Sequence, residues 1–506
     1  MSFGSDTPEY AASPPPLRTD TLVDSVLILL ALTVVQRLVG FVRSVLFCRW
    51  LTPEQLGLWD MAFSFLLLAA PISVLAIPGA FGRYLEHYRQ RGQLHVFLRR
   101  AVRVCGGLAC VSITVIVLAR RWLALLVFGD ADQYPMVVLA AGCLTVVIIY
   151  NFIIESFIAL RNIRLASIMQ LINSVAFAAL GVGLLLGWQY TAKSVLVFYG
   201  GSCLIAIVWA GYLLRRVCRN APPDVAMGQH IKVWSKVVPF AAWVLLGSVL
   251  SNLFGVVDRY MILHFSNLTN IEALDAVGNY HASRVVPVLL VSIAMMLGSM
   301  ITPHLSHDWE AGQHGQVVSR LRLFLKLFGF ALFAAAVAVL VASPLLFNMV
   351  FRGKFPEGQH VLPWTLIYCT WFGLAMIVEC YLLCAEKARL PSVALACGLA
   401  LNVPLNLLLL PRFGLQGAVL ATAAANAFSL GLICWFNRRL GFHFDAGTTL
   451  VLVLPIVLCL GPWVAVVTLP VVAAIAIWSD WLLSPEEKHQ LAEGLAEYKK
   501  RIGLGR

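Results

Sequence analysis

Long apolar runs recur along the whole chain, and they constrain its fold more than any other feature. Each run of about 18–25 residues is long enough to cross the roughly 30 Å hydrocarbon core of a bilayer as a helix. Of all residues, 60% are hydrophobic and 12% are charged. A soluble domain carries about 25% charged residues. The sequence therefore predicts an all-α polytopic membrane protein.

We expect about fourteen membrane-spanning helices, with ends accurate to a few residues. The predicted spans are residues 22–48, 56–82, 103–120, 136–160, 165–187, 193–214, 237–262, 279–301, 324–347, 362–384, 391–410, 415–437, 447–463 and 464–483. Only Gly461-Pro462 separates the last two. Glycine and proline inside the spans are common in membrane helices and count against a soluble core.

Short motifs repeat in order along the chain. Gly40-Phe-Val-Arg43 parallels Gly255-Val-Val-Asp258, and Gly57-Leu-Trp59 parallels Gly278-Asn-Tyr280. The repeating unit holds six helices, an even number, so both copies share one orientation and the substrate path is expected between them. The expected parts are a disordered cytoplasmic tail (1–20), an N-lobe (21–218), a C-lobe (219–440), a two-helix extension (441–483) and a cytoplasmic C-terminal helix (484–506).

Positive charge is distributed unevenly between the two sides of the predicted bundle. Most of the 37 Lys and Arg residues fall in the even-numbered loops and the two ends of the chain. The positive-inside rule then places both termini in the cytoplasm. The net charge of +12 is thus a topology signal, and no nucleic-acid partner is expected, because no basic run is interleaved with aromatics on a soluble element.

No pattern of catalytic or metal-binding residues stands out. The 12 cysteines are scattered without a CxxC, and the 11 histidines show no HExxH, so we expect no metal site. Asp130-Ala-Asp132 has the D-x-D pattern of a glycosyltransferase, but it lies in a short loop, where a turn explains it better. We therefore expect a protein that is not an enzyme.

Two arginines, Arg37 and Arg43, lie inside the first predicted span. A guanidinium at mid-bilayer costs at least about 2.5–3.5 kcal/mol, so it must face a watery cavity or a partner. The pair predicts a cavity for an anionic substrate, although Arg43 could instead snorkel to the lipid head groups. Arg259, in the seventh span, and Arg284, early in the eighth, complete the candidate substrate-binding set.

Two acidic residues in the spans are candidates for a gate or an ion-coupling site. Asp258 is the repeat counterpart of Arg43, which predicts that the two pair across the cleft. The alternative is an interfacial pair between Asp258 and Arg259. Asp60, near the start of the second span, could balance an arginine, bind a proton or cap its helix.

Glu155 and Glu379 are the remaining candidates for gating or ion coupling. They occupy equivalent places near the cytoplasmic ends of the fourth and tenth spans. A symmetric cytoplasmic gate is one interpretation, and local pairs with Arg161 and Lys387 are the other. A proton or a sodium ion is left open as the coupling ion, and no other cofactor is expected.

Several of these motifs resemble the polysaccharide (O-antigen type) flippases. The similar segments are Arg37-x-x-Gly40-x-x-Arg43, Leu51-Thr-Pro-Glu-Gln-Leu-Gly57-Leu-Trp59, Val257-Asp258-Arg259-Tyr260, Gly278-Asn-Tyr280, Phe351-Arg-Gly-Lys-Phe-Pro356 and Pro411-Arg-Phe-Gly414-Leu-Gln-Gly417-Ala418. The first span is also similar to that of the lipid II flippases, in the same superfamily of multidrug, oligosaccharidyl-lipid and polysaccharide exporters. Ser44 stands where lipid II flippases often have Asp, which favours the polysaccharide branch.

The resemblance implies a flippase that moves an undecaprenyl-diphosphate-linked oligosaccharide to the outer leaflet by alternating access, without covalent chemistry. It also implies a polysaccharide polymerase or ligase as a partner. The arginines suit this function independently, because arginine binds phosphate oxygens bidentately. The alternatives are a lipid II flippase, a drug extruder with acidic residues in its N-lobe cavity, a membrane glycosyltransferase and a non-transporting scaffold.

Overall fold

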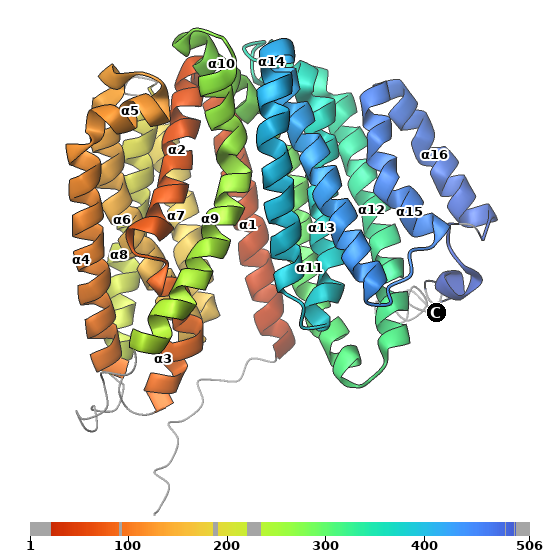
Figure 1. Ribbon diagram of the computed structural model, residues 1–506, viewed down its shortest axis with the longest axis horizontal. Helices are drawn as coiled ribbons and strands as arrows, with labels where there is room; N and C mark the ends of the chain where they lie inside the picture. The colour runs from red at the N-terminus through yellow and green to blue at the C-terminus, as the bar shows by residue number, and fades with distance from the viewer. Residues whose placement is uncertain are drawn as a thin grey trace, which may run out of the picture.

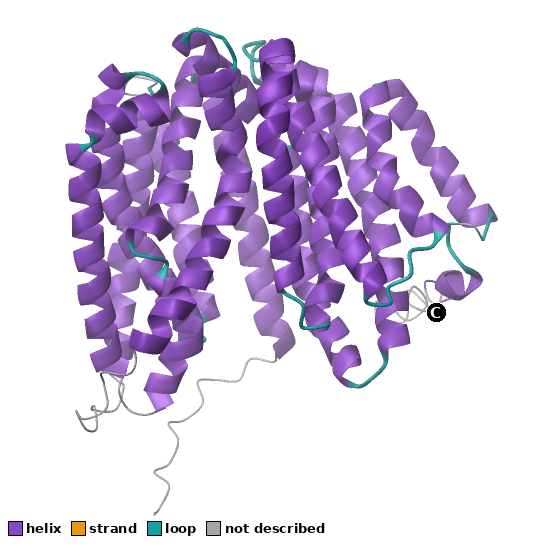
Figure 2. Cartoon of the chain, viewed as in Figure 1, coloured by secondary structure: helices purple, strands orange, loops and turns teal. Residues whose placement is uncertain are grey.

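The computed structural model describes residues 22–90, 94–185, 191–219, 234–480, 482–489 and 491. This part of the chain is a bundle of helices that run roughly side by side, and no strand occurs in it (Figures 1 and 2). The predicted tail at 1–20 and most of the predicted C-terminal helix lie outside the described residues.

The first half of the chain contributes eight α-helices and two short 3₁₀ segments. They are α1 (Leu22–Trp50), α2 (Pro53–Ser73), η1 (Ile77–Ala80), α3 (Phe81–Gln90), α4 (Leu94–Leu118), α5 (Arg120–Phe128), η2 (Ala131–Gln133), α6 (Tyr134–Ala159), α7 (Ile163–Leu185) and α8 (Ala192–Arg219). Local chemistry sets these boundaries. For example, α2 begins at Pro53 because Thr52 Oγ1 accepts a hydrogen bond from the Gln55 N–H, the usual arrangement at an N-cap.

The second half continues the bundle in the same manner. Its elements are α9 (Trp234–Phe265), α10 (Asn270–Arg284), α11 (Pro287–Glu310), α12 (His314–Pro344), the π-helical turn η4 (Leu345–Val350), α13 (Pro356–Cys384), α14 (Arg389–Arg439), α15 (Ala446–Val453), η5 (Leu454–Leu460) and α16 (Pro462–Trp478). A capping box between Thr269 and Glu272 starts α10.

The predicted polytopic helical fold is confirmed. Within the described residues, eleven helices are long and apolar enough to cross a membrane, and two shorter apolar segments, Ala446–Leu460 and Pro462–Trp478, follow them. The 51-residue α14 is two antiparallel helices that meet at Gly414, whose φ of 56° and ψ of −139° reverse the chain. A hydrogen bond from Asn402 to Thr422 across this hairpin shows that its two arms pack together. Each predicted span thus has a helical counterpart.

Two predicted spans differ from the helices in detail. The eighth is broken into α10 and α11, and the second ends at Ser73 instead of residue 82. Leu75 and Ala76 adopt left-handed φ values of 52° and 48° after the helix. Pro78, just beyond, lacks the backbone N–H that a continuing helix would need.

The two halves of the chain meet where α2 crosses α10, at the top of Figure 1. We call this end the distal face, and the end that carries Leu22 the N-terminal face. A Cβ atom at Gly57 would lie 2.0 Å from the Leu274 carbonyl oxygen, and one at Gly278 would lie 2.0 Å from the Pro53 carbonyl oxygen. The two contacts are reciprocal, as a pseudo-two-fold axis through the crossing requires. Glycine is therefore needed on both helices for this close approach.

Candidate functional site

A buried ion cluster lies immediately inside the α2–α10 crossing. The Asp60 side chain on α2 is only 2% exposed. It accepts a hydrogen bond from Arg259 Nε on α9, and its other oxygen lies 3.0 Å from Nδ1 of His281 on α10. Of the interpretations offered for Asp60, the structure shows charge balance with an arginine, while Thr52 caps the helix. The pair joins the two halves of the chain.

Asp258 occupies a separate network within the second half. Its carboxylate accepts hydrogen bonds from Tyr280 Oη at 2.9 Å, Asn402 Nδ2 at 3.2 Å and Asn406 Nδ2 at 3.3 Å. All three donors are neutral. A buried charge needs hydrogen-bond partners, and these three donors supply them. None of the three is a cation.

The pairs predicted for Asp258 are not formed in this structure. Arg43 lies instead with its guanidinium carbon 4.2 Å from the centre of the Phe177 ring. Arg259 binds Asp60, because successive residues of a helix point about 100° apart. Asp258 therefore faces α10 and α14 while Arg259 faces α2.

Beside Asp258 is a cavity of about 180 Å³. Its polar lining comes from Ser251, Asp258, Tyr280, Arg284, Tyr368, Thr422 and Asn426. Among the described residues, Arg284 Nε and Nη1 have no hydrogen-bond partner, and Asn406 Oδ1 is likewise unpartnered. The cluster is rich in oxygen atoms of the kind that hard cations prefer. In the described ranges, no group of three or more His, Cys, Asp or Glu forms a metal site.

The predicted arginines of the first span line a larger cavity of about 410 Å³ between the two halves. Arg37, Gly40, Ser44 and Phe47 follow one another at helical spacing on the face of α1 that borders it. Arg43 is half-buried and Arg37 is exposed. The other polar side chains of the lining are uncharged, His281 excepted: Gln36, Gln170, Asn173, Ser174, Tyr199 and Ser292. In the part of the chain that the structure describes, no carboxylate borders this cavity.

Aromatic residues from several helices hold Arg43 in place. Phe177 stacks edge-on with Phe47, at 5.6 Å between ring centres, and also packs on Trp59 and Tyr199. The guanidinium of Arg43 over the Phe177 ring is a cation–π contact, which stabilises the charge where water is scarce. The head group of Arg43 therefore points to the cavity border rather than away from the bundle.

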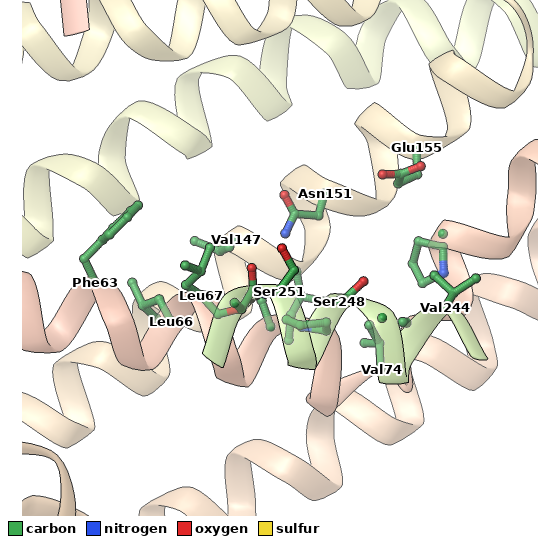
Figure 3. A pocket seen from close by; sticks show the side chains of 18 of the residues that line it. Phe63, Leu66, Leu67, Val74, Val147, Asn151, Glu155, Val244, Ser248 and Ser251 are labelled. Atoms are coloured by element: carbon green, nitrogen blue, oxygen red, sulfur yellow. Dashed lines mark hydrogen bonds between the residues drawn. The ribbon is translucent and has the colours of Figure 1, made fainter. Parts of the chain in front are cut away.

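A third cavity, of about 610 Å³, lies between α2, α6, α8 and α9. Among the described residues, Glu155 is the only charged one that lines it (Figure 3). Figure 3 shows Asn151 and Ser251 pointing toward one another from its opposite walls. Phe63 and Tyr199 border both this cavity and the one that holds Arg43, so the two spaces adjoin.

Glu155 and Glu379 occupy unlike surroundings. Glu155 borders the cavity of about 610 Å³, whereas Glu379 lies half-buried on α13 and borders neither that cavity nor the one of about 410 Å³. Neither of the predicted local pairs, with Arg161 or Lys387, is among the ion pairs of the described residues. In this structure the two glutamates do not border the same one of these cavities, and a cytoplasmic gate formed by them stays a prediction.

Sequence reasoning missed several residues of these networks. Four polar residues belong to the networks because they contact Asp60 or Asp258 in the folded protein: His281, Tyr280, Asn402 and Asn406. One signal was present for two of them: Asn402 and Asn406 are four residues apart in an otherwise apolar span, so they share a helix face. Polar side chains on one face of a membrane helix point to the bundle interior.

The sequence of this chain is similar to those of known membrane proteins. A family model described as "Polysaccharide biosynthesis protein" matches residues 22–309. The Bacillus subtilis lipid II flippase MurJ is 20% identical over 452 residues, or 81% of this chain and 82% of that protein. An uncharacterized membrane protein of B. subtilis, YabM, is 21% identical over 434 residues, or 79% and 78% of the two chains.

Solved structures share the fold. A lipid II flippase MurJ in an inward closed conformation superposes with a TM-score of 0.68 at 13% identity, over 89% of this chain and 98% of that chain. An inward-facing multidrug resistance MATE family transporter of the MOP superfamily gives a TM-score of 0.62 at 13% identity, over 82% and 97%. The relatives whose functions are named are thus a flippase and a transporter rather than enzymes.

The resemblance read from Arg37 to Gly417 and the structural match point to the same group of membrane proteins. The family match covers more than half of the 506-residue chain. This chain therefore belongs to the polysaccharide biosynthesis protein family, and it shares the fold of a lipid II flippase and of a multidrug transporter.

Proposed function

We propose that this protein is a flippase that moves an undecaprenyl-diphosphate-linked oligosaccharide across the bacterial cytoplasmic membrane by alternating access. The N-terminal face lies in the cytoplasm and the distal face lies outside, as the distribution of Lys and Arg supports. The product then passes to a polysaccharide polymerase or ligase at the outer leaflet. The family description supports a role in polysaccharide biosynthesis.

The 410 Å³ cavity is the observation that carries this proposal. Two guanidinium groups, Arg37 and Arg43, border it, and no carboxylate does. Arginine pairs bidentately with phosphate oxygens, so the two can neutralise a diphosphate while the prenyl tail stays in lipid. Side-chain amides from Gln36, Gln170 and Asn173 supply donors and acceptors for sugar hydroxyls. An extruder of cationic drugs needs acidic groups in this place.

The test is translocation of a fluorescent lipid-linked oligosaccharide in proteoliposomes. Wild type is compared with Arg37→Ala, Arg43→Ala and a matched control, Arg121→Ala, an exposed arginine outside the cavity. We expect transport by wild type and the control, and its loss in both cavity variants at equal amounts of folded protein. Absence of wild-type transport for every diphosphate-linked lipid contradicts the proposal.

Lipid II is the second candidate substrate, because the lipid II flippase MurJ matches most of this chain in sequence and in structure. Both lipids carry a diphosphate, so the arginines do not discriminate between them. Translocation is therefore measured in vesicles that contain each lipid alone, and then in vesicles that contain both lipids in competition. Preference for the oligosaccharide lipid supports the polysaccharide role, and preference for lipid II reassigns the substrate.

The driving force is proposed to be a proton or a sodium ion that binds at Asp258. The carboxylate, the unpartnered Asn406 Oδ1 and the nearby Thr422 hydroxyl bring oxygen atoms together on α9 and α14. In the same vesicles, transport driven by a sodium gradient is compared with transport driven by a pH gradient. Asp258→Asn is expected to abolish the dependence on the ion that couples. If neither gradient changes the rate, the coupling proposal fails.

A further inference from the structure

Lys354 ties the second half of the chain to the end of α1 on the distal face. Its ammonium group donates hydrogen bonds to three backbone oxygens, of Arg49 at 2.8 Å, Trp50 at 3.4 Å and Leu51 at 3.1 Å. These are the last carbonyls of α1, which have no partner within the helix and carry the negative end of its dipole. A cation is the favoured group at such a position.

The turn that presents Lys354 is rigidly held. Phe351 and Phe355, on either side of it, are both fully buried and their rings pack edge to face. Asn279 Oδ1 on α10 accepts a hydrogen bond from the Gly358 N–H at the start of α13, at 3.0 Å. Lys354 therefore moves with α10 and α13, whereas the carbonyls that it binds directly precede α2.

A second contact of the same kind occurs at the reciprocal place. His264, near the end of α9, lies with Nε2 2.7 Å from the Leu126 carbonyl oxygen, near the end of α5. The ring N–H donates, since the carbonyl can only accept. Beside it, Gly129 adopts a left-handed φ of 72° and packs against Asn270, the first residue of α10. Both contacts thus place a side chain from the second half on the C-terminal carbonyls of a helix from the first half.

We propose that Lys354 and His264 are latches that hold the distal face closed, and that Lys354 is the stronger of the two. The inference rests on the alternating access of the proposed function. Opening the distal face separates α2 from α10, because the two glycine contacts cannot persist in an open state. That movement carries Arg49–Leu51 away from Lys354 and breaks three charge-assisted hydrogen bonds at once.

The latch predicts a conformational equilibrium that can be measured without any substrate. Spin labels are attached through a keto amino acid at positions 132 and 357, two exposed sites on opposite halves of the distal face, so the 12 native cysteines remain. Pulsed electron resonance on the full-length protein in nanodiscs then gives the fractions with the distal face closed and open. Lys354→Met keeps the apolar stem and removes the charge.

We expect Lys354→Met to raise the ratio of open to closed protein about tenfold, the effect of losing hydrogen bonds to a charged group. Lys354→Arg should restore the wild-type ratio, and His264→Leu should raise it about twofold. Lys488→Met is the matched control: this ammonium also binds helix-end carbonyls, of Ile477 and Ser479, but outside the distal face. The ratio of open to closed protein in Lys488→Met should equal that of wild type.

The outcomes separate the latch from the proposed function. If wild type and all variants show a single closed distance even when lipid substrate is added, alternating access itself fails. If wild type shows both distances and Lys354→Met leaves their ratio unchanged, the latch is wrong. An equal shift in Lys488→Met also overturns it. If Lys354→Met does not fold, Lys354→Gln, which retains a neutral donor, carries the test, with a smaller shift expected.

Discussion

The two halves of this protein hold opposite charges at equivalent places. Arg43 on α1 borders a cavity of about 410 Å³ that contains no carboxylate, and Asp258 on α9 borders one of about 180 Å³ and is held by neutral donors. Each of the two residues is the last one of the repeated four-residue motif in its half of the chain. One framework thus places a base beside the cavity of the first half and an acid beside that of the second half, where Arg284 also lines the wall.

Under the proposed function, this contrast separates the two tasks of an ion-coupled flippase. An anionic head group needs cations that are not already neutralised, and the first half provides Arg37 and Arg43. A coupling cation needs a carboxylate that is not already salt-bridged, and Asp258 meets that condition among its hydrogen-bond partners. The paired charges, Asp60 with Arg259 and His281, lie instead on the boundary between the halves.

Breaking the boundary pair should have the largest effect. Asp60→Ala leaves Arg259 buried without its counter-charge, which costs about 3–5 kcal/mol for a buried pair that loses one partner. The free energy of unfolding of the purified protein, from denaturant titration in detergent micelles, measures the loss. The matched control is Asp132→Ala, an exposed aspartate, for which a change below about 0.5 kcal/mol is expected. Equal changes in the two variants contradict the assignment.

Reversing the charge of the anion site should come next. Arg43→Glu places an acid where the second half already has one, and it repels a diphosphate at the 410 Å³ cavity. We expect translocation of the lipid-linked oligosaccharide to fall about a hundredfold, which corresponds to about 2.7 kcal/mol. The exposed arginine variant Arg121→Glu should transport as wild type does. Wild-type transport by Arg43→Glu would show that the cavity does not bind the head group.

Neutralising the acid of the second half is expected to have a smaller effect. Asp258→Asn keeps the size of the side chain but removes the charge that a coupling cation needs, so gradient-driven transport should fall about tenfold. Transport down a substrate gradient, without an ion gradient, should change less than twofold. The same measurements on Asp480→Asn, an exposed position, provide the control. A parallel loss of both kinds of transport argues for a purely structural role.

The smallest effect is expected for charges outside both cavities. Asp445, in the loop before α15, is partly buried, which raises its pKa, but hydrogen bonds from Lys326 and Thr448 outweigh this and leave the pKa lowered. A lowered pKa contributes stability above the unfolded value of about 3.9, and this contribution is lost as the pH falls through the folded value. Between pH 5 and pH 3, the denaturant midpoint of unfolding should decrease in wild type. In Asp445→Asn it should decrease by less.

The difference between the two proteins should stay below about 1 kcal/mol, because solvent screens the partly exposed Asp445 carboxylate and Glu487 still neutralises the buried Lys326. Translocation at neutral pH should be unchanged, since Asp445 borders neither cavity of the comparison. A change in transport at neutral pH would show that the loop takes part in the conformational cycle.

Much of the fold could be predicted from the sequence, because membrane helices are specified by local composition. Even the hairpin within α14 was predicted, since Pro411 and Gly414 interrupt the apolar run there. The predicted role of Arg37 and Arg43 at a cavity border likewise needs only the cost of a charge in lipid. These inferences do not depend on which helices are neighbours.

The pairing of charges could not be predicted in the same way. Asp60 and Arg259 are far apart in the chain, and their contact depends on how α2 lies against α9 and α10. Repeat symmetry suggested Arg43 as the partner of Asp258, but symmetry relates the positions of two residues without bringing them into contact. Only the residues beside the axis itself, such as Gly57 and Gly278, meet near their own counterparts.

The ion cluster at the α2–α10 crossing has a consequence for the ancestry of the chain. His281 stands three residues after Gly278, as Asp60 stands three residues after Gly57, and the two side chains touch at 3.0 Å. In a homodimer of identical six-helix subunits, any residue at that place would face its own copy, and two carboxylates would repel each other. Within one polypeptide this constraint is absent, so one half can carry an acid at that place while the other carries a base.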